Sequence, residues 1–488
     1  MFAAVCTVTN LRNSTVDITQ YETLQKQNVL EVIMEHTRSK KTLAKKSGPK
    51  ISFVLALMGA IVIFSSSNGY SIPSYARQTG LACSSCHYNF PQLTPFGRLF
   101  KLNGYTMVGS PTLVSAHNEE KDMQLLSSFP LSAMVMTSFS QVSKATPGAE
   151  ASSTQFPQQL SLFISGELTP KLGSYVQLTY DPSAGTIGMD MAEFRYADHT
   201  LLGSKDLLYG LTLNNNPTMQ DVWNTTPAWG FPYVSSASAP GPSWTPILAN
   251  TMSGNVLGLG AYALYDNLIY AEISAYHSAI QGLSYPADST WTNNIKGLSP
   301  YWRLALQHDW GHQYLEVGTF GLASSMFPAG ISGLYNKYTD LGFDAQYEKS
   351  LGGGELVAHA SYITEKQNLD AAFASGGSAS NSLTLNSFKI DANYNFPSLF
   401  ALALGYFSTT GTSDAILYAP ASVTGSANGS PNSSGITAQV SFIPWLNTQI
   451  ALQYVAYQKF NGGSTNYDGS GRNASDNNTL YLVTWFAF

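Results

Sequence analysis

The stretch Phe388-Lys389-Ile390-Asp391-Ala392-Asn393-Tyr394-Asn395-Phe396 decides the fold of this chain, because apolar and polar residues alternate through it without a break. Every even position from 388 to 396 is apolar and every odd position is polar. A period of two is typical of a β-strand with one apolar and one polar environment on its two faces. Residues 303–307, 341–348 and 449–454 alternate in a similar way. The pattern therefore predicts an all-β chain.

The spacing of such segments indicates what kind of β-structure they build. Sixteen segments begin near positions 129, 157, 173, 189, 206, 255, 268, 300, 314, 338, 354, 383, 398, 433, 447 and 478. Short links, such as Asp266-Asn267, Gly311-His312-Gln313 and Pro397, tend to alternate with long ones, such as 215–254, 279–299, 411–432 and 460–477. A soluble sandwich also shows alternating strands. Short turns at one end and long loops at the other are typical of outer-membrane barrels, which have an even strand number.

Composition agrees with a membrane barrel. Only 11% of the residues are charged, against about 25% in ordinary soluble domains. No run after residue 70 offers the roughly 18 apolar residues of a spanning helix. Thr479–Phe488 reads as a last strand that ends on an aromatic residue, as in bacterial outer-membrane proteins. We predict a transmembrane antiparallel β-barrel of about 16 strands over residues 126–488, in the outer membrane of a Gram-negative bacterium. The net charge of −6 and the lack of a basic patch argue against nucleic-acid binding.

Residues 1–69 read as a leader and signal peptide. Basic residues from Arg38 to Lys50 precede an apolar run of 14 residues, Ile51–Phe64, and a small polar stretch follows it. This order, with so short an apolar core, predicts secretory export rather than a membrane anchor. Met34 would begin a signal peptide of ordinary length, so we expect that the true start lies there.

Cys83-Ser84-Ser85-Cys86-His87 is the motif that carries chemistry. The C-x-x-C-H spacing is the signature of c-type haem attachment, in which two thiols add to the porphyrin vinyl groups and the histidine binds the iron. A disulfide is the ordinary alternative in an exported protein, and a zinc knuckle would need a second ligand pair nearby. The motif predicts one covalently bound haem c on residues 70–125, with Cys83 and Cys86 binding the cofactor and His87 binding its iron.

The sequence offers three candidates for the sixth iron ligand. Met107 lies twenty residues after His87, and His117 and Met123 are its nearest rivals. Methionine ligation would raise the haem potential, although a methionine at such a place is otherwise a core residue that fills a gap. We take Met107 as the candidate metal ligand and keep both rivals open.

The haem segment is too short to build an ordinary core of its own. With an even strand count, the first strand begins and the last strand ends on the same side of the membrane, the periplasmic side. We therefore expect residues 70–125 to enter from that side and to plug or sit within the barrel. The lumen should carry charged residues, and the candidates are Glu193, Arg195, Glu272, Arg303, Asp309, Asp344, Lys389 and Asp391. Loop 215–254, which contains Trp223, Trp229, Phe231, Tyr233 and Trp244, either folds inward, caps the mouth or lies on the surface.

The stretch Ala76–Met107, ARQTGLACSSCHYNFPQLTPFGRLFKLNGYTM, resembles the haem segment of the outer-membrane cytochrome–porin fusions of iron-oxidising bacteria. Its specific motifs cover only these 32 residues. The resemblance implies a single-haem segment joined to a sixteen-stranded porin. It also implies an oxidoreductase that takes electrons from ferrous iron outside the cell. The acceptor would be a periplasmic cytochrome c or blue-copper carrier.

Three other functions remain open at this point. The chain could be a diffusion porin with a haem plug, or a conduit that carries electrons outward to extracellular acceptors. A soluble haem enzyme such as a peroxidase is the third, but we find no distal motif for it. The haem potential would separate the electron-transfer directions, and iron coordination would reveal a peroxidase.

Overall fold

The structure is a computed structural model that describes residues 74–107, 113–118, 121–126, 129–182, 185–250, 252–279, 294–328 and 330–488. The side chains of 113–118 and 121–126 are outside this description. The predicted leader and signal peptide, residues 1–69, also lies outside the described residues.

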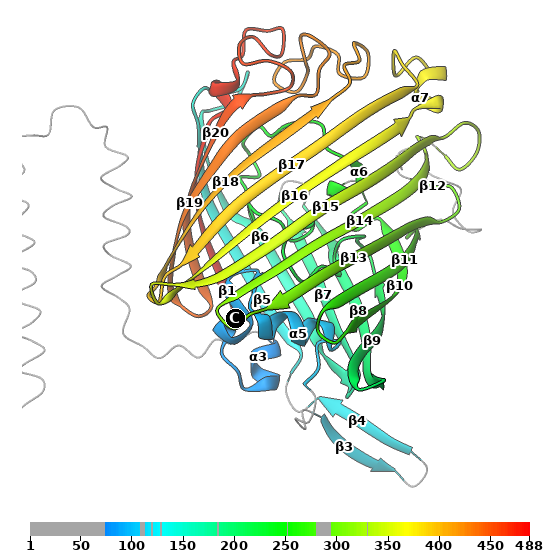
Figure 1. The fold of residues 1–488 in the computed structure, drawn as a ribbon. Coiled ribbons are helices and arrows are strands. Elements are labelled where there is room, and N and C mark those ends of the chain that lie inside the picture. The colour runs from blue at the N-terminus through cyan, green and yellow to red at the C-terminus, as the bar shows by residue number, and fades with distance from the viewer. Residues whose placement is uncertain are drawn as a thin grey trace, which may run out of the picture. The chain divides into compact units, whose positions relative to one another are not determined.

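Sixteen antiparallel strands close into one barrel, as the sequence predicted (Figure 1). They are β5 (Leu131–Val142), β6 (Ser152–Thr169), β7 (Leu172–Asp181), β8 (Thr186–Leu202), β9 (Lys205–Asn214), β10 (Val256–Tyr265), β11 (Ile269–Ser278), β13 (Ser299–Asp309), β14 (Gln313–Phe327), β15 (Asn336–Leu351), β16 (Gly354–Asn368), β17 (Ser382–Asn395), β18 (Phe400–Gly411), β19 (Ser433–Trp445), β20 (Thr448–Lys459) and β21 (Thr479–Ala487). The two-residue strand β12 (Asn294–Ile295) pairs with the end of β14 at Met326 and Phe327, and β13 pairs with the rest of β14 from Leu322 back to Tyr314. Pairing of β21 with β5 closes the ring.

Alternation along each strand separates the lumen from the outer face. On β17, Asp391, Asn393 and Asn395 are buried, while Ile390 is 46% exposed on the opposite face. On β13, Arg303 is fully buried and Leu304 is 52% exposed. Every second side chain of a strand points the same way. The polar set therefore lines the lumen and the apolar set covers the outside.

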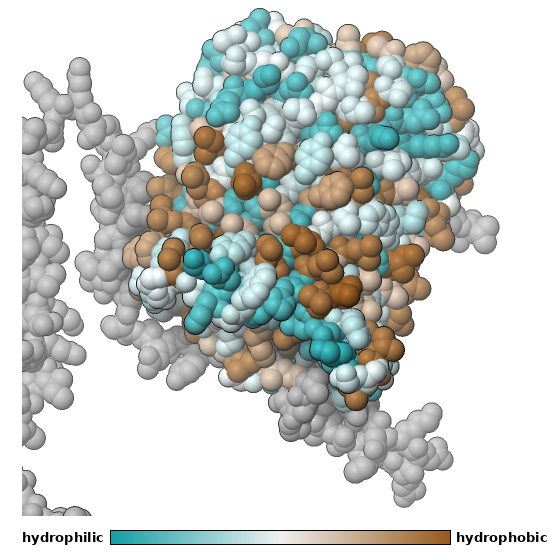
Figure 2. All heavy atoms as spheres, in the orientation of Figure 1, coloured by the Kyte–Doolittle hydropathy of each residue, from teal (hydrophilic) through white to brown (hydrophobic). Residues whose placement is uncertain are grey.

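The apolar outer face identifies the barrel as a transmembrane one. Large apolar side chains such as Leu259, Ile273 and Leu404 are each at least 60% exposed. Figure 2 shows apolar residues gathered over the middle and short-turn part of the wall and polar ones around the long-loop end. A closed barrel satisfies every backbone group within lipid, and this outer band is typical of outer-membrane barrels. The chain is thus a multi-pass outer-membrane β-barrel. None of the helices in the described parts of the chain is long and apolar enough to span a membrane.

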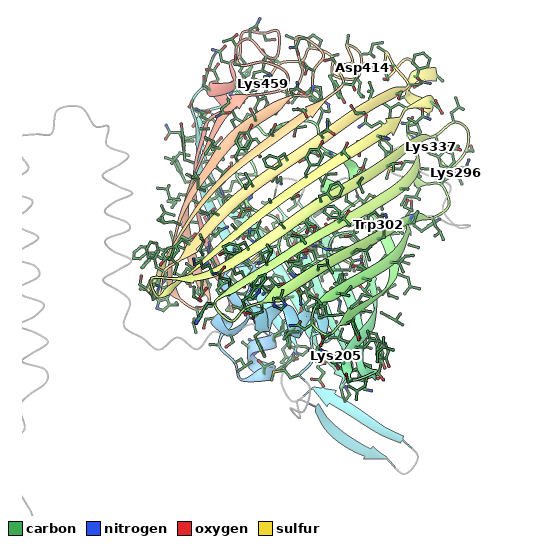
Figure 3. The ribbon with its side chains drawn as sticks, in the orientation of Figure 1. Lys205, Lys296, Trp302, Lys337, Asp414 and Lys459 are labelled. Atoms are coloured by element: carbon green, nitrogen blue, oxygen red, sulfur yellow. The ribbon has the colours of Figure 1, made fainter. Side chains whose placement is uncertain are left out.

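The connections differ sharply between the two ends of the barrel. Asp266 and Asn267 make a two-residue turn with φ of 53° and 50°, the left-handed conformation that tight hairpins require. The predicted long loops between β9 and β10, β18 and β19, and β20 and β21 all lie at the opposite end. The loops carry the short helices α6 (Ile247–Asn250) and η2 (Ala474–Asn477), while α7 (Asp370–Ala374) follows β16. In Figure 3, Asp414 and Lys459 mark the long-loop end and Lys205 the short-turn end. Short turns face the periplasm in such barrels.

The segment that carries the cysteine motif lies inside the short-turn end of the barrel (Figure 1). It comprises α3 (Ser74–Thr79), α4 (Cys83–Cys86), β1 (His87–Asn89), β2 (Gln92–Leu93) and α5 (Pro95–Leu102). We call residues 74–107 the plug. A separate two-stranded sheet, β3 (Leu113–Asn118) with β4 (Lys121–Leu126), follows it.

Hydrogen bonds and an ion pair hold the plug to the wall on several sides. Arg98 pairs with Glu348 of β15. The Tyr105 hydroxyl donates to Glu193 of β8 over 2.5 Å, and the Tyr262 hydroxyl of β10 donates to the Leu102 carbonyl over 2.6 Å. These residues are buried, so each contact replaces water at groups that would be costly to leave unpaired. The lumen is therefore packed as an interior at this end.

Candidate functional site

The cysteine motif is held in place by helix α5. Thr94 caps this helix, because its side chain accepts a hydrogen bond from the Gly97 N–H over 3.1 Å, and Pro95 fits the first turn. The same Thr94 hydroxyl donates to the Ser85 carbonyl over 2.6 Å. One side chain thus joins the helix start to the middle of the motif.

Gly97 brings the helix and the motif into backbone contact. A Cβ atom placed on Gly97 would lie 2.2 Å from the Cys86 carbonyl oxygen. No side chain fits there, and the neighbouring atom is backbone that cannot rotate away. Gly97 is therefore required by the close approach of α5 to Cys86.

His87 faces the interior with one ring nitrogen engaged. Its Nδ1 lies 3.3 Å from the Pro91 carbonyl oxygen. Because a carbonyl only accepts, Nδ1 carries the proton and Nε2 keeps its lone pair. Burial lowers the pKa of His87 to about 4, although hydrogen bonds to the backbone of Pro91 and Gln92 act in the opposite direction and raise it. The imidazole is therefore neutral at physiological pH, which is the form that binds a metal.

Cys83 and Cys86 are both free thiols. Burial raises the pKa of Cys83, and it raises that of Cys86 to about 11 with a further contribution from Cys83. Neither thiol is an ionised, reactive thiolate at neutral pH.

A cavity of about 440 Å³ lies against the motif. Cys83, Cys86 and His87 line it from the plug, together with Phe90, whose tilted ring has its centre 4.9 Å from that of the His87 ring. The rest of the lining is mainly apolar and comes from other residues of the plug, from the barrel wall and from the loop between β9 and β10. A volume of a few hundred Å³ with an apolar lining and few polar groups is typical of a cofactor site. These residues fit a haem on the thiol and imidazole groups of the motif.

The loop between β9 and β10 folds inward, which was one of the three expectations from the sequence. We call residues 215–246 the inner loop. Its first part, 215–226, is buried throughout. The Trp223 Nε1 donates to the Tyr314 hydroxyl over 2.7 Å, and Lys101 of the plug donates to the carbonyls of Met219 and Asp221 over 2.6 and 2.8 Å. The inner loop therefore runs from the long-loop end down to the plug and the cavity.

The structure brings the predicted iron ligands together only in part. Met107 is half-buried, and it is not among the described residues that line the cavity. The side chains of His117 and Met123, in the β3–β4 hairpin, lie outside the described ones. Three other methionines line the cavity from the barrel wall: Met134, Met136 and Met191.

The sequence carries a signal that points to two of these methionines. The lumen face of β5 reads Ser132, Met134, Met136, Ser138, with both methionines 3% exposed. Two methionines between serines on the inward face of one strand indicate that the otherwise polar lumen is apolar at this depth.

Most predicted lumen charges are buried in the lumen and paired there. Arg303 contacts three carboxylates, those of Asp221, Glu316 and Asp344. Glu193 pairs with Arg195 over 3.1 Å. Glu272 and Asp391, also predicted, are 6% and 7% exposed, and Asp391 meets His359 Nδ1 over 2.8 Å. Glu316, Glu348 and His359 were missed, because alternation predicts a face but not a partner.

Asp309 and Lys389 differ from the other predicted lumen charges, since both are exposed. Asp309 lies at the end of β13, where it accepts the Gly311 N–H over 2.6 Å. Its expected place inside the lumen is wrong, because the strand ends there and the carboxylate stabilises the turn. Lys389 shares the lumen face with Asp391 by alternation. Across the described parts of the chain, no three His, Cys, Asp or Glu side chains are gathered as a metal site.

No protein-family model matches this chain, and no curated protein sequence does. Solved structures similar to it include OmpF of Salmonella typhi, in a complex with daunomycin, with 12% identity and a TM-score of 0.43 over 77% of this chain and 100% of that one. An anion-selective porin of Comamonas acidovorans has 14% identity and a TM-score of 0.43, over 73% and 98%. The outer-membrane channel DcaP of Acinetobacter baumannii has 12% identity and a TM-score of 0.41, over 73% and 96%. The evidence for the barrel, its apolar band and its plug is the strand pairing and the side-chain burial of this chain itself.

Proposed function

We propose that this protein is an outer-membrane electron-transfer protein, a ferrous iron oxidoreductase that carries one covalently bound haem c. Cys83 and Cys86 would hold the porphyrin and His87 would bind its iron. The observation that carries the proposal is the position of this motif in the wall of a mainly apolar cavity of about 440 Å³ inside the barrel. When bound, the haem supplies a site that accepts and releases single electrons.

The residues of the chain set the conditions for such a centre. The Pro91 carbonyl fixes the proton on Nδ1 of His87 and so leaves Nε2 as the nitrogen that could bind iron. A hydrogen bond to the far ring nitrogen of a ligating histidine fixes its tautomer and tunes its basicity. The inner loop covers the cavity with Trp229, whose indole N–H donates to the Met219 carbonyl over 2.8 Å. An apolar, covered site favours the less charged, reduced state and raises the potential.

The position of the cavity supports inward electron flow. The cavity adjoins the plug at the short-turn end, which faces the periplasm in outer-membrane barrels. A periplasmic cytochrome c or blue-copper carrier could therefore take the electron there. Ferrous iron would arrive from the long-loop end. The hydrocarbon core is about 30 Å thick, which is too far for a single electron-tunnelling step. Iron therefore has to enter the lumen or reach the inner loop.

The second candidate is a diffusion porin with a haem plug, which a closed barrel also fits. Against an open lumen stand the side chains of Arg195, Arg303 and Glu316, which are fully buried although they line it. Water therefore does not reach them. The third, outward electron transfer, differs from our proposal in the sign of the haem potential.

The test is expression with a c-type haem maturation system, purification in detergent and measurement of haem that survives denaturation. We expect one haem per chain, no covalent haem in Cys83→Ala or Cys86→Ala, and normal attachment in the matched control Ser84→Ala. Ferrous iron should then reduce the haem of the wild type rapidly. A folded barrel without covalent haem would overturn the proposal. A haem of strongly negative potential that ferrous iron cannot reduce would leave the outward conduit or the plugged porin.

A further inference from the structure

We infer that the sixth ligand of the haem iron is a methionine of the barrel wall, one of Met134, Met136 and Met191, and not a residue of the plug. This inference rests on the proposed function, because it concerns the same cavity. It would make the cofactor a bridge: attached to the plug by Cys83, Cys86 and His87, and bound to the barrel through a sulfur atom.

The first step is an inventory of ligand groups around the cavity. Among its described lining residues, His87 is the only histidine, and Cys83 and Cys86 belong to the attachment motif. The carboxylates of Asp190 and Asp221 also line the cavity, but they already accept hydrogen bonds from Thr179 and Thr226. The other groups that could bind haem iron are methionine sulfur, lysine nitrogen and tyrosine oxygen. All three methionines come from the wall: Met134 and Met136 from β5, and Met191 from β8.

The second step removes Lys101. Its ammonium donates to the carbonyls of Met219 and Asp221 over 2.6 and 2.8 Å, and it lies 4.6 Å from the centre of the Trp229 ring. A charged amine bound in this way would have to lose a proton and two hydrogen bonds before it could bind iron. Its burial therefore reflects attachment of the plug to the inner loop.

The third step concerns the tyrosines of the cavity. The hydroxyls of Tyr75, Tyr105 and Tyr175 all donate to protein acceptors: the Ser174 carbonyl, Glu193 and Gln177. Tyr233 is the exception, because its hydroxyl is buried without a hydrogen-bond partner among the described residues. Tyrosine is the haem ligand of catalase, whereas an acceptor of electrons from ferrous iron needs the higher potential that methionine opposite histidine gives. Tyr233 suits a hydrogen bond to a polar group in the cavity.

The fourth step is the chemistry of the methionines themselves. Met134 and Met136 both point into the lumen, where serines occupy the neighbouring inward positions. Met191 lies on the same lumen face as Glu193 and Arg195, both fully buried. Sulfur is a soft, polarisable ligand, and a flexible side chain can reach a metal without strain in the backbone. Methionine opposite histidine also raises the potential, as an acceptor of electrons from ferrous iron requires.

Leucine substitution tests the ligand with little change in packing, because the two side chains have similar volumes. The variants are Met134→Leu, Met136→Leu and Met191→Leu. Met107→Leu represents the plug, and Met189→Leu is the matched control, since Met189 lies two residues from Met191 and is 53% exposed on the outer face. The readouts are covalent haem content, the far-red absorption band that ferric haem shows with a methionine ligand, and the midpoint potential.

We expect one of the three wall variants to lose the band and to fall in potential while it keeps one covalent haem per chain. Met107→Leu and Met189→Leu should keep both the band and the potential. Loss of the band in Met107→Leu, its retention in all three wall variants, or a wild-type haem with no methionine signature would overturn the inference and leave the proposed function standing. Absence of covalent haem from the wild type would instead overturn the proposed function itself.

Discussion

At the scale of the residue, the candidate site depends on how closely a helix approaches a motif. Gly97 permits backbone contact with Cys86, and Thr94 ties the helix start to Ser85. Neither residue would touch the iron in our proposal. Both fix the position of the two cysteines and His87 relative to the cavity.

We predict that Gly97→Ala lowers the fraction of chains that carry covalent haem several-fold. The new Cβ would lie 2.2 Å from the Cys86 carbonyl oxygen, so α5 or the motif must move. Covalent haem per folded barrel measures the effect. Leu99→Ala, on the same helix and 40% exposed, should have little influence. Equal haem content in the wild type and Gly97→Ala would show that the close approach is dispensable.

At the scale of the element, the positions of the strands were predictable from the sequence, but the contacts inside the lumen were not. All sixteen predicted strand starts lie within five residues of the observed ones, and the largest difference is at β6, 157 against 152. Strand alternation is local, so a sequence displays it. The inward fold of the inner loop, the pairing of Arg98 with Glu348 and the wall methionines depend on contacts across the lumen. Residues hundreds of positions apart make those contacts, and no local pattern encodes them.

The long loops show the same dependence on distant contacts. Asp414, which is 3% exposed, accepts the backbone N–H groups of Ala379, Ser380, Ile416 and Leu417 and the Ser378 hydroxyl. It thereby joins the loop after β18 to the one after β16. Burial alone would raise the pKa of Asp414, but the N–H groups of Leu417 and Ala379 lower it to about 2 from an ordinary 3.8.

We predict that Asp414 stabilises these loops above pH 4 and loses this effect as the pH falls toward 2. A carboxyl whose pKa is lowered by folding contributes its full stability above the unfolded pKa, here on the order of 2 kcal/mol. Hydrogen exchange of residues 378–417 should be faster in Asp414→Asn than in the wild type at pH 5, and the two should converge near pH 2. A difference that does not depend on pH would contradict an ionised Asp414.

At the scale of the whole molecule, the barrel encloses a filled lumen. The plug occupies the short-turn end, and the inner loop reaches it from the other side. A shared core joins them, with Leu102 from the plug, Trp223 from the inner loop and Tyr270 from the wall all buried together. The two inserts block the lumen in series.

We predict low ion conductance for the wild-type barrel in a planar bilayer. Replacing residues 227–236 of the inner loop by a short Gly-Ser linker should leave the plug in place and raise conductance only slightly. Removing the plug as well should raise it strongly, since both obstacles are then gone. A wild-type conductance equal to that of the doubly deleted barrel would support the diffusion porin.

The most direct measurement of the central claim is electron transfer across a membrane. The protein is placed in liposomes that contain oxidised cytochrome c, ferrous iron is added outside, and reduction of the trapped cytochrome is followed by absorbance. Cys86→Ala, with its barrel shown to be folded, is the control for iron leakage. The account predicts rapid reduction with the wild type and only the leak rate with Cys86→Ala. Equal rates in the two preparations would contradict it.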